Sequence, residues 1–390
     1  MKIGNIIIPS GCKPTPLGII PEDWEVTRIG DWGKVITGST PPTEDEANYG
    51  ETYKFVSPAD ISESKYIQDT EKHLSEKGFA LSRPMPKGTV LFTCIGSTIG
   101  KCAIADEELT SNQQINAIIC DNEHNHDYLY YELCHNSNKI RQLAGEQAVP
   151  IINKTTFESF KMLCPPIKEQ NKIASILSIW DIAIDKQTAL IEQLTLRKCG
   201  LLQQLLTGRK RLKGFEEEWK TIEVGDALSY IQPTKYLVCN ENYNDSYDTP
   251  VLTAGKTFIL GYTNEKTGIF DDLPAIIFDD FTTESKYVTF PFKAKSSAMK
   301  ILKAENSNLY YMFCIMQIIK YSIGGHERNW ISKYSHLTIK APSIEEQNAI
   351  ASILVNADKE IEIQKQKLAA MQEQKKGLMQ VLLTGKRRVK

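Results

Sequence analysis

Two segments of the chain carry apolar residues at alternating steps of four and three, which places them along one side of an α-helix. Each pattern continues without a break for more than four heptads, which predicts a long helix that pairs with another helix. The first predicted seam contains Ile173, Leu177, Trp180, Ile184, Gln187, Ile191, Leu194, Lys198, Leu201 and Leu205. The second contains Ile350, Leu354, Ala357, Ile361, Gln364, Leu368, Met371, Lys375, Leu378 and Leu382.

The two helical segments are copies of one sequence. Residues 164–213 and 341–390 align without a gap at an offset of 177, and 23 of the 50 aligned pairs are identical. Chance would give about three. A repeat that closes each half of the chain predicts a duplicated architecture.

Start and stop signals bound both predicted helices. Ser343 and Glu346 match a capping box at the start of the second helix, whereas Pro166 replaces the serine in the first. Gly208 and Gly385 predict the two helix ends. A basic cluster follows each glycine, where the helix dipole favours cations.

Polar residues recur at equivalent positions of the two seams, namely Gln187 with Gln364 and Lys198 with Lys375. Apolar residues would be more stable there, so we interpret the polar ones as devices that define the register of the pair. The alternative is that they are tolerated imperfections near water. Their recurrence in both copies weakens that alternative.

The repeats divide the chain into four predicted parts. These are a first globular block over residues 1–165, a first spacer helix over 166–211, a second globular block over 212–342 and a second spacer helix over 343–390. Each helix would extend about 60 Å at 1.5 Å per residue. Antiparallel pairing is the simplest arrangement because both ends of the second block then lie at one end of the helices. We therefore expect an antiparallel coiled coil with a globular block at each end and pseudo-two-fold symmetry.

The two globular blocks open alike and differ in between. The segment from Trp24 to Asp31 aligns with the segment from Trp219 to Asp226. Short strand-like runs alternate with turns rich in Gly, Ser, Asn and Asp, and a short helical stretch follows in each block. This pattern predicts an α+β domain in each block. Because the two blocks share their opening segments but differ in between, we predict that they recognise two different targets.

The formal net charge of −2 conceals an uneven distribution. Residues 167–211 carry 8 basic and 4 acidic side chains, and residues 344–390 carry 9 and 6. Residues 1–166 carry 15 basic and 22 acidic side chains, and residues 212–343 carry 14 basic and 16 acidic side chains. This balance argues against non-specific coating of nucleic acid but is compatible with a local basic face.

The nine cysteines are scattered and form no Cys-x-x-Cys motif, so we expect reduced thiols in a cytoplasmic protein. No apolar run approaches the roughly 18 residues of a membrane span, and no membrane partner is expected.

Taken in order and in duplicate, the motifs resemble the specificity subunit of Type I restriction-modification systems. The resemblance rests on the helix openings Pro165 to Gln170 and Pro342 to Gln347, the Leu-Leu-Thr-Gly closings, the Trp…Gly-Asp block openings, Lys87 to Leu91, Gly96 to Gly100 and Asn112-Gln113. The second block departs from this pattern because it has Ala275 to Asp280 and no Gly-Ser-x-x-Gly. Its reading loops therefore cannot be matched to the first block from sequence.

The resemblance implies a non-catalytic chain in which each block is a target recognition domain. Each domain would read one half of a bipartite, asymmetric sequence in double-stranded DNA. The helices would set the gap between the halves and dock two modification subunits, joined by restriction/translocase subunits. No cofactor or metal is expected in this chain, whereas S-adenosylmethionine and ATP with magnesium are expected in the partner subunits.

Candidate DNA-binding residues lie in predicted turns and loops, where hydroxyl, amide, imidazole, ammonium and guanidinium groups could meet base edges or phosphates. In the first block they are Ser97, Thr98, Lys101, Gln147 and Asn153. In the second block they are Lys286, Tyr287, His326, Arg328 and Asn329. A purely structural turn is the alternative at each position.

Two other functions are compatible with parts of the sequence. One is a stand-alone magnesium-dependent nuclease using Asp280, Glu284 and Lys286, which requires the carboxylates to converge on a metal. The other is a coiled-coil scaffold that binds protein without reading DNA. Incubation with magnesium and plasmid tests the nuclease. Methylation that requires both this chain and a modification subunit separates DNA reading from the scaffold.

Overall fold

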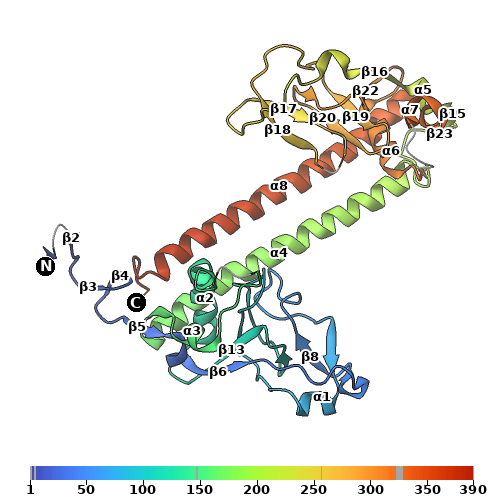
Figure 1. The fold of residues 1–390 in the computed structure, drawn as a ribbon. Coiled ribbons are helices and arrows are strands. Elements are labelled where there is room, and N and C mark those ends of the chain that lie inside the picture. Colours follow the sequence, from blue (N-terminus) through green and yellow to red (C-terminus); the bar gives the residue numbers. More distant parts are fainter. Residues whose placement is uncertain (1, 4–5, 146–147, 256, 322–327, 390) are drawn as a thin grey trace. The chain divides into compact units, whose positions relative to one another are not determined.

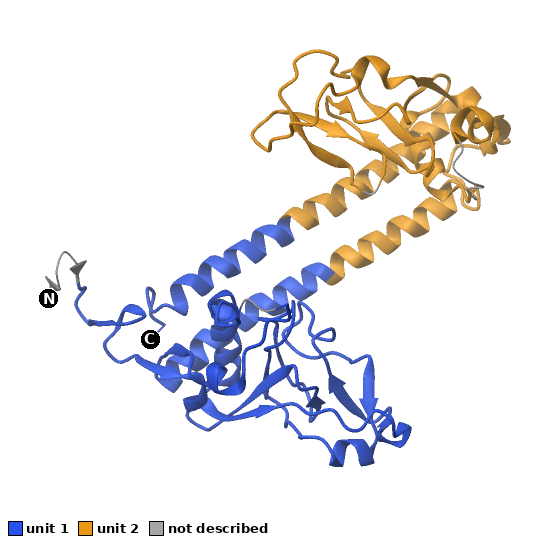
Figure 2. Cartoon of the chain, in the orientation of Figure 1, with its two compact units in different colours: residues 1–188, 367–390 blue, residues 189–366 orange. Residues whose placement is uncertain are grey.

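The computed structural model describes residues 2–3, 6–145, 148–255, 257–321 and 328–389. The chain divides into two compact units, unit 1 with residues 1–188 and 367–390, and unit 2 with residues 189–366 (Figure 2). The long helices α4 (Ile167–Leu205) and α8 (Ile344–Leu382), labelled in Figure 1, each contribute to both units (Figure 2). Each unit therefore combines one globular block with the start of one long helix and the end of the other.

The globular part of unit 1 contains two sheets and several short helices. A main antiparallel sheet has the order β11-β10-β13-β6, with bounds Cys102–Ile104, Val90–Thr93, Ile115–Cys120 and Gly33–Thr37. A second sheet has the order β12-β8-β9-β7, with bounds Thr110–Ser111, Tyr53–Val56, Lys72–Leu74 and Tyr49–Gly50. The helices are α1 (Glu76–Ala80), α2 (His126–Arg141) and α3 (Lys154–Glu158). Helix α2 packs against β10 and β11.

Short strand pairs complete unit 1. β5 (Glu25–Arg28) pairs with β14 (Lys161–Cys164), which leads into α4. Two N-terminal pairs precede them, with bounds Lys2–Ile3 and Ile6–Ile7 for β1 and β2, and Cys12–Thr15 and Gly18–Pro21 for β3 and β4.

Unit 2 repeats this arrangement. Its main antiparallel sheet has the order β16-β22-β19-β20, with bounds Leu228–Ile231, Met299–Ala304, Ala275–Asp279 and Ser285–Val288. The second sheet has the order β18-β17-β21, with bounds Ile259–Thr263, Thr249–Leu252 and Lys293–Ala294. β15 (Lys220–Glu223) pairs with β23 (Thr338–Ala341), which leads into α8. The shorter helices are α5 (Val224–Ala227), α6 (Leu309–Ile318) and α7 (Asn329–Ser332).

The strand orders show which elements of the two units correspond. Strands β11, β10, β13 and β6 match β20, β19, β22 and β16, respectively. The second sheet of each unit contains one parallel strand pair, β8 with β12 in unit 1 and β17 with β21 in unit 2. The α+β prediction is therefore confirmed in both blocks. The hairpin β10–β11 corresponds to β19–β20. This correspondence was not visible in the sequences, which differ between the two blocks.

The long helices take part in the core of each unit. In unit 1, Ile173 and Leu177 of α4 share a core with Leu382 of α8. In unit 2, Leu205 of α4 shares a core with Leu354 of α8. Within each unit the start of one helix thus packs against the end of the other, so the two helices run antiparallel. Every residue of the two predicted seams is buried or half-buried, and burial of each large apolar side chain contributes about 1.5–3 kcal/mol.

The nine cysteines all lie in the described part of the chain and carry free thiols. Within the same part, no helix is both long enough and apolar enough to cross a membrane.

One carboxyl group lies within the core of unit 1. Glu132 on α2 is 2% exposed. Its Oε1 accepts hydrogen bonds from Asn136 Nδ2 at 3.0 Å and from the Leu163 amide at 3.3 Å, while Oε2 has no partner among the described residues. Burial raises the pKa of Glu132 from 4.5 to about 8, because a charged carboxylate is poorly solvated there.

We predict that Glu132→Gln flattens the pH dependence of stability. The folded state holds this proton more tightly than the unfolded state, so its contribution is full below pH 4.5 and is lost as the pH rises to about 8. The loss amounts to about 1.4 kcal/mol per pH unit between the two pKa values. Urea denaturation at pH 6, 7 and 8 should show a decline in the wild type that is absent from Glu132→Gln. The exposed Glu123→Gln is the control and should retain the decline; an unchanged slope in Glu132→Gln would contradict the assignment.

Candidate nucleic-acid interface and helix junctions

A buried glutamate near the start of α4 joins three separate segments of unit 1. Glu169 Oε2 accepts a hydrogen bond from Trp24 Nε1 at 2.9 Å. Arg388, which follows α8, donates from Nε to Oε1 at 2.9 Å and from Nη2 to Oε2 at 2.7 Å. Burial acts to raise the pKa of Glu169, but hydrogen bonds from Arg388, Trp24 and the Val389 amide outweigh it and hold the pKa below its usual value. We call this set the Trp–Glu–Arg junction.

Unit 2 contains the equivalent junction. Arg211, which follows α4, donates from Nε and Nη2 to the two oxygens of Glu346, both at 2.8 Å. Trp219 Nε1 donates to the same carboxylate at 3.2 Å. The capping-box prediction for Glu346 is therefore wrong, because its carboxylate binds Arg211 and Trp219. The Glu346 side chain therefore makes long-range contacts and does not cap its own helix.

The Leu-Leu-Thr-Gly closings turn the chain so that each arginine reaches its glutamate. Gly208 and Gly385 have φ values of 69° and 68°, a left-handed conformation that favours glycine. The amide of Lys210 then bonds the carbonyl of Gln204 at 3.0 Å, and the amide of Arg387 bonds that of Val381 at 3.0 Å. These bonds satisfy carbonyls at the helix ends and reverse the chain direction.

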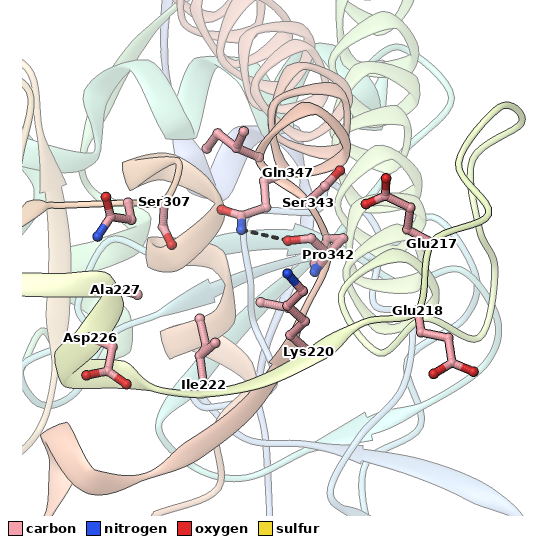
Figure 3. A pocket seen from close by; sticks show the side chains of 13 residues that line it. Glu217, Glu218, Lys220, Ile222, Asp226, Ala227, Ser307, Pro342, Ser343 and Gln347 are labelled. Carbon is pink, nitrogen blue, oxygen red and sulfur yellow. Dashed lines mark hydrogen bonds between the residues drawn. The ribbon is translucent and has the colours of Figure 1, made fainter.

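The Gln-Asn pair after each glutamate connects the long helix to the block. Gln347 Nε2 donates to the Pro342 carbonyl at 3.0 Å, and its Oε1 accepts from the Asn308 amide at 2.9 Å. Gln170 makes the corresponding contacts with Pro165 and Asn125. Figure 3 shows the Gln347–Pro342 hydrogen bond at the edge of a cavity of about 330 Å³. Asn308 and Asn125 begin α6 and α2, so each Gln anchors the helix that covers the main sheet.

The lysines of the two seams form ion pairs with the opposite long helix. Lys198 pairs with Asp358 in unit 2, and Lys375 pairs with Asp181 in unit 1. Tyr310 and Tyr131 donate to the same aspartates. Each cluster thus links α4, α8 and the helix of the block. These charged partners explain why lysine stands at an otherwise apolar seam.

Three candidates of the first block, Ser97, Thr98 and Lys101, lie in the loop of the β10–β11 hairpin. Gly96 and Gly100 have φ values of 90° and 102°, so both glycines are required by the turn. Ser97 at the tip is exposed and Thr98 is half-buried. Lys101 Nζ donates to the carbonyls of Pro58 and Ile61 at 3.2 and 2.6 Å, so it anchors a neighbouring loop.

The corresponding β19–β20 hairpin has a shorter loop over residues 280–284. Asp279 Oδ1 accepts hydrogen bonds from the amides of Phe281 and Thr282 at 3.0 and 2.8 Å. Thr283 has a φ of 58°, and Phe281 at the tip is 38% exposed. An exposed aromatic ring in a tightly held turn is a suitable contact for a ligand. Sequence reasoning missed Phe281, although an aromatic residue in a polar turn was a usable signal.

The other candidates have different surroundings. Asn153 is exposed and caps α3 through the Thr156 amide. Lys286 and Tyr287 are half-buried on β20, where Tyr287 packs against the rings of Tyr310 and Phe313 and burial raises its pKa. Gln147 and His326 lie outside the described residues.

The start of α7 lies beside the second hairpin. Asn329 is 1% exposed and its Nδ2 donates to the Asp280 carbonyl at 3.0 Å. Its Oδ1 accepts from Tyr321 at 2.9 Å, so its side chain is held inside the unit. Arg328 next to it is exposed. Arg328 therefore directly precedes a residue that bonds the loop 280–284.

The carboxylates considered for a nuclease have separate roles. Asp280 is 1% exposed and lies 3.6 Å from Lys300 Nζ. Asp279 shapes the turn, and Glu284 is half-buried beside it. Within the described residues, no group of three or more His, Cys, Asp or Glu side chains is arranged to hold a metal ion.

Comparison with known proteins places these features in a family. The family described as Type I restriction modification DNA specificity domain matches residues 21–196 and 216–373. The putative Type I restriction enzyme MjaX specificity subunit of Methanocaldococcus jannaschii is 30% identical over 429 aligned positions that cover 97% of each chain. The EcoR124I/EcoR124II specificity subunit of Escherichia coli is 50% identical over 140 residues, which cover 34% of each chain.

Solved structures share the fold. The crystal structure of the Type I restriction-modification S subunit from M. genitalium matches with a TM-score of 0.64 at 15% identity, covering 92% of this chain and 96% of that one. A chain from a structure of complex assembly in the type I R-M system matches with a TM-score of 0.57 at 13% identity, covering 94% and 99%. At these identities the likeness concerns the fold.

We predict that Glu346→Ala strongly destabilises the protein. The change leaves Arg211 and Trp219 without their acceptor. Because the Arg211 side chain is 30% exposed, we expect the cost of lost hydrogen bonds to a charged group, about 1.5–3 kcal/mol. The neighbouring Glu345 is exposed, so Glu345→Ala is the matched control and should change stability by about 0.5 kcal/mol or less. Equilibrium denaturation of both variants tests this. Equal effects of the two substitutions would contradict the importance of the junction.

Proposed function

The chain belongs to the family of Type I restriction-modification specificity subunits, and we propose that it directs DNA modification to one bipartite, asymmetric sequence. Each globular block reads one half-site. The observation that supports this most strongly is the duplicated frame: the two main sheets have the same strand order but carry different hairpin loops. Loops on a rigid scaffold are where recognition residues are commonly found.

The two hairpins offer different chemistry to a DNA groove. The first presents the hydroxyls of Ser97 and Thr98 on a glycine-framed turn. The second presents Phe281 beside Arg328, and arginine is well suited to guanine or phosphate. Two chemically different readers favour two different half-sites. Gln147, Asn153, Lys286, Tyr287 and His326 remain candidates for further contacts, whereas Lys101 and Asn329 are better suited to supporting the loops.

We propose that the chain is non-catalytic and functions in the cytoplasm with two modification subunits and with restriction/translocase subunits. S-adenosylmethionine, and ATP with magnesium, would be bound by those partners. The long helices are the proposed docking elements. In unit 1, Ile179 and Ile182 lie outside the seam of α4 and are 64% and 54% exposed. Large apolar side chains that are exposed on a helix favour a protein partner.

We propose the functional boundaries at residues 165, 211 and 342, with the blocks as exchangeable readers. Replacing residues 24–163 with the equivalent block of a relative should change one half-site of the methylated sequence and leave the other unchanged, because the strand frame and junction residues are shared. Methylome sequencing of cells that also express the modification subunit measures both half-sites. A change in both would contradict the assignment of one block to one half-site.

We predict that the helices determine the gap between half-sites. Inserting one heptad after Ile191 and one after Leu368 preserves both seams and lengthens each helix by about 10 Å. The gap in the methylated sequence should widen by up to about three base pairs, at roughly 3.4 Å each, with unaltered half-sites.

The control for this experiment is a heptad inserted in α4 alone, which should misalign the seams and lower the thermal midpoint. Methylome sequencing of the double insertion decides the matter. The same half-sites at an unchanged gap would show that the helices do not determine spacing.

A further inference from the structure

Corresponding positions in the two main sheets carry polar side chains beneath the hairpins. Asn116 on β13 lies opposite Phe92 on β10, and Lys300 on β22 lies opposite Phe278 on β19. Two residues beyond each phenylalanine, the loop begins at Cys94 or Asp280. The strand register thus makes Asn116 structurally equivalent to Lys300, and Cys94 structurally equivalent to Asp280.

A third residue completes each set: Thr37 on β6 in unit 1 and Gln232 directly after β16 in unit 2. In unit 1, Asn116 Nδ2 lies 3.2 Å from Cys94 Sγ, and Thr37 Oγ1 donates to Asn116 Oδ1 at 2.7 Å. In unit 2, Lys300 Nζ lies 3.6 Å from Asp280 Oδ2 and donates to Gln232 Oε1 at 2.7 Å. We call these the neutral trio and the charged trio.

The charged trio costs more to bury than the neutral one. The side chains of Asp280 and Lys300 are 1% and 3% exposed, and removing two charges from water opposes folding unless they are well paired. The neutral trio occupies the same place in the same frame, so the frame itself does not require an ion pair. The hairpin loop above the trio is what differs between the units. We therefore infer that the ion pair acts on this loop.

Asp280 joins the loop to the start of α7. Its carbonyl accepts a hydrogen bond from the Asn329 amide at 2.9 Å, and its Oδ1 accepts from the Trp330 amide at 2.8 Å. The Trp330 ring packs against Phe278 with centroids 5.2 Å apart. Through its carbonyl and its carboxylate, Asp280 therefore ties the start of α7, which follows Arg328, to the loop that carries Phe281.

We propose that the buried Asp280–Lys300 pair is the positioning element of the second reader, and that Phe281 is its apolar base contact. This deepens the proposed function and rests on it. The pair keeps the loop 280–284 and Arg328 in one arrangement, and Phe281 meets an apolar group such as the thymine methyl in the major groove. Asp280 and Lys300 themselves remain buried and touch no DNA.

The test uses the complete complex with the modification subunit and a duplex oligonucleotide carrying the methylated sequence. Two competitor duplexes have one half-site scrambled, and the block exchange above assigns each half-site to its unit. The ratio of affinities for intact and scrambled duplex is measured for each half-site, since this ratio does not depend on the fraction of folded protein. Asp280→Asn with Lys300→Met should reduce discrimination at the second half-site by about tenfold or more and leave the first unchanged.

Lys293 and Glu265 provide a matched control, because buried Lys293 and half-buried Glu265 form another ion pair of unit 2, with Nζ and Oε2 2.7 Å apart. Lys293→Met with Glu265→Gln should retain both ratios even where stability falls. Phe281→Ala should reduce only the second ratio, without loss of stability. Unchanged ratios in Asp280→Asn/Lys300→Met, or an equal fall at both half-sites, would overturn the positioning role. If the wild-type complex does not discriminate either scrambled duplex, the proposed function itself fails.

Discussion

One buried glutamate in each unit holds together segments that are far apart in the chain. Glu169 receives Trp24 from the opening of the first block and Arg388 from beyond the end of α8; Glu346 receives Trp219 and Arg211 in the same way. A buried carboxylate without its arginine is strongly destabilising, so the three motifs must be present together. This explains why the block opening, the helix opening and the basic closing all occur twice.

The junctions separate what is constant from what varies. Each connects a long helix to the strand pair that frames its block, and the Gln-Asn pair anchors the helix that covers the main sheet. The hairpins lie on that frame but contribute nothing to the junctions. Their sequences can therefore diverge without loss of the architecture, as the glycine turn of unit 1 and the Asp280 loop of unit 2 illustrate. A scaffold of this kind supports changes of DNA target at little cost in stability.

The sequence predicted the helices well because heptad spacing and glycine stops are local signals. It also predicted the α+β class and the duplication. It failed where partners are distant: Glu346 matched a capping box, but its carboxylate bonds Arg211, 135 residues away. The internal contacts of Lys101 also depend on distant partners, because its ammonium donates to two carbonyls of a loop about 40 residues earlier. The charged trio and the match between the two hairpins depend on strand register, which is a property of the folded sheet.

The proposed reading of two different half-sites at a fixed separation underlies the roles assigned to the blocks and the helices. Methylome sequencing of a host that lacks other such systems and expresses the unaltered chain with its modification subunit tests this most directly. We expect a single methylated motif with two unlike half-sites and a constant gap of unspecified bases. A continuous motif, a palindromic one, or methylation that is unchanged when this chain is omitted would contradict it.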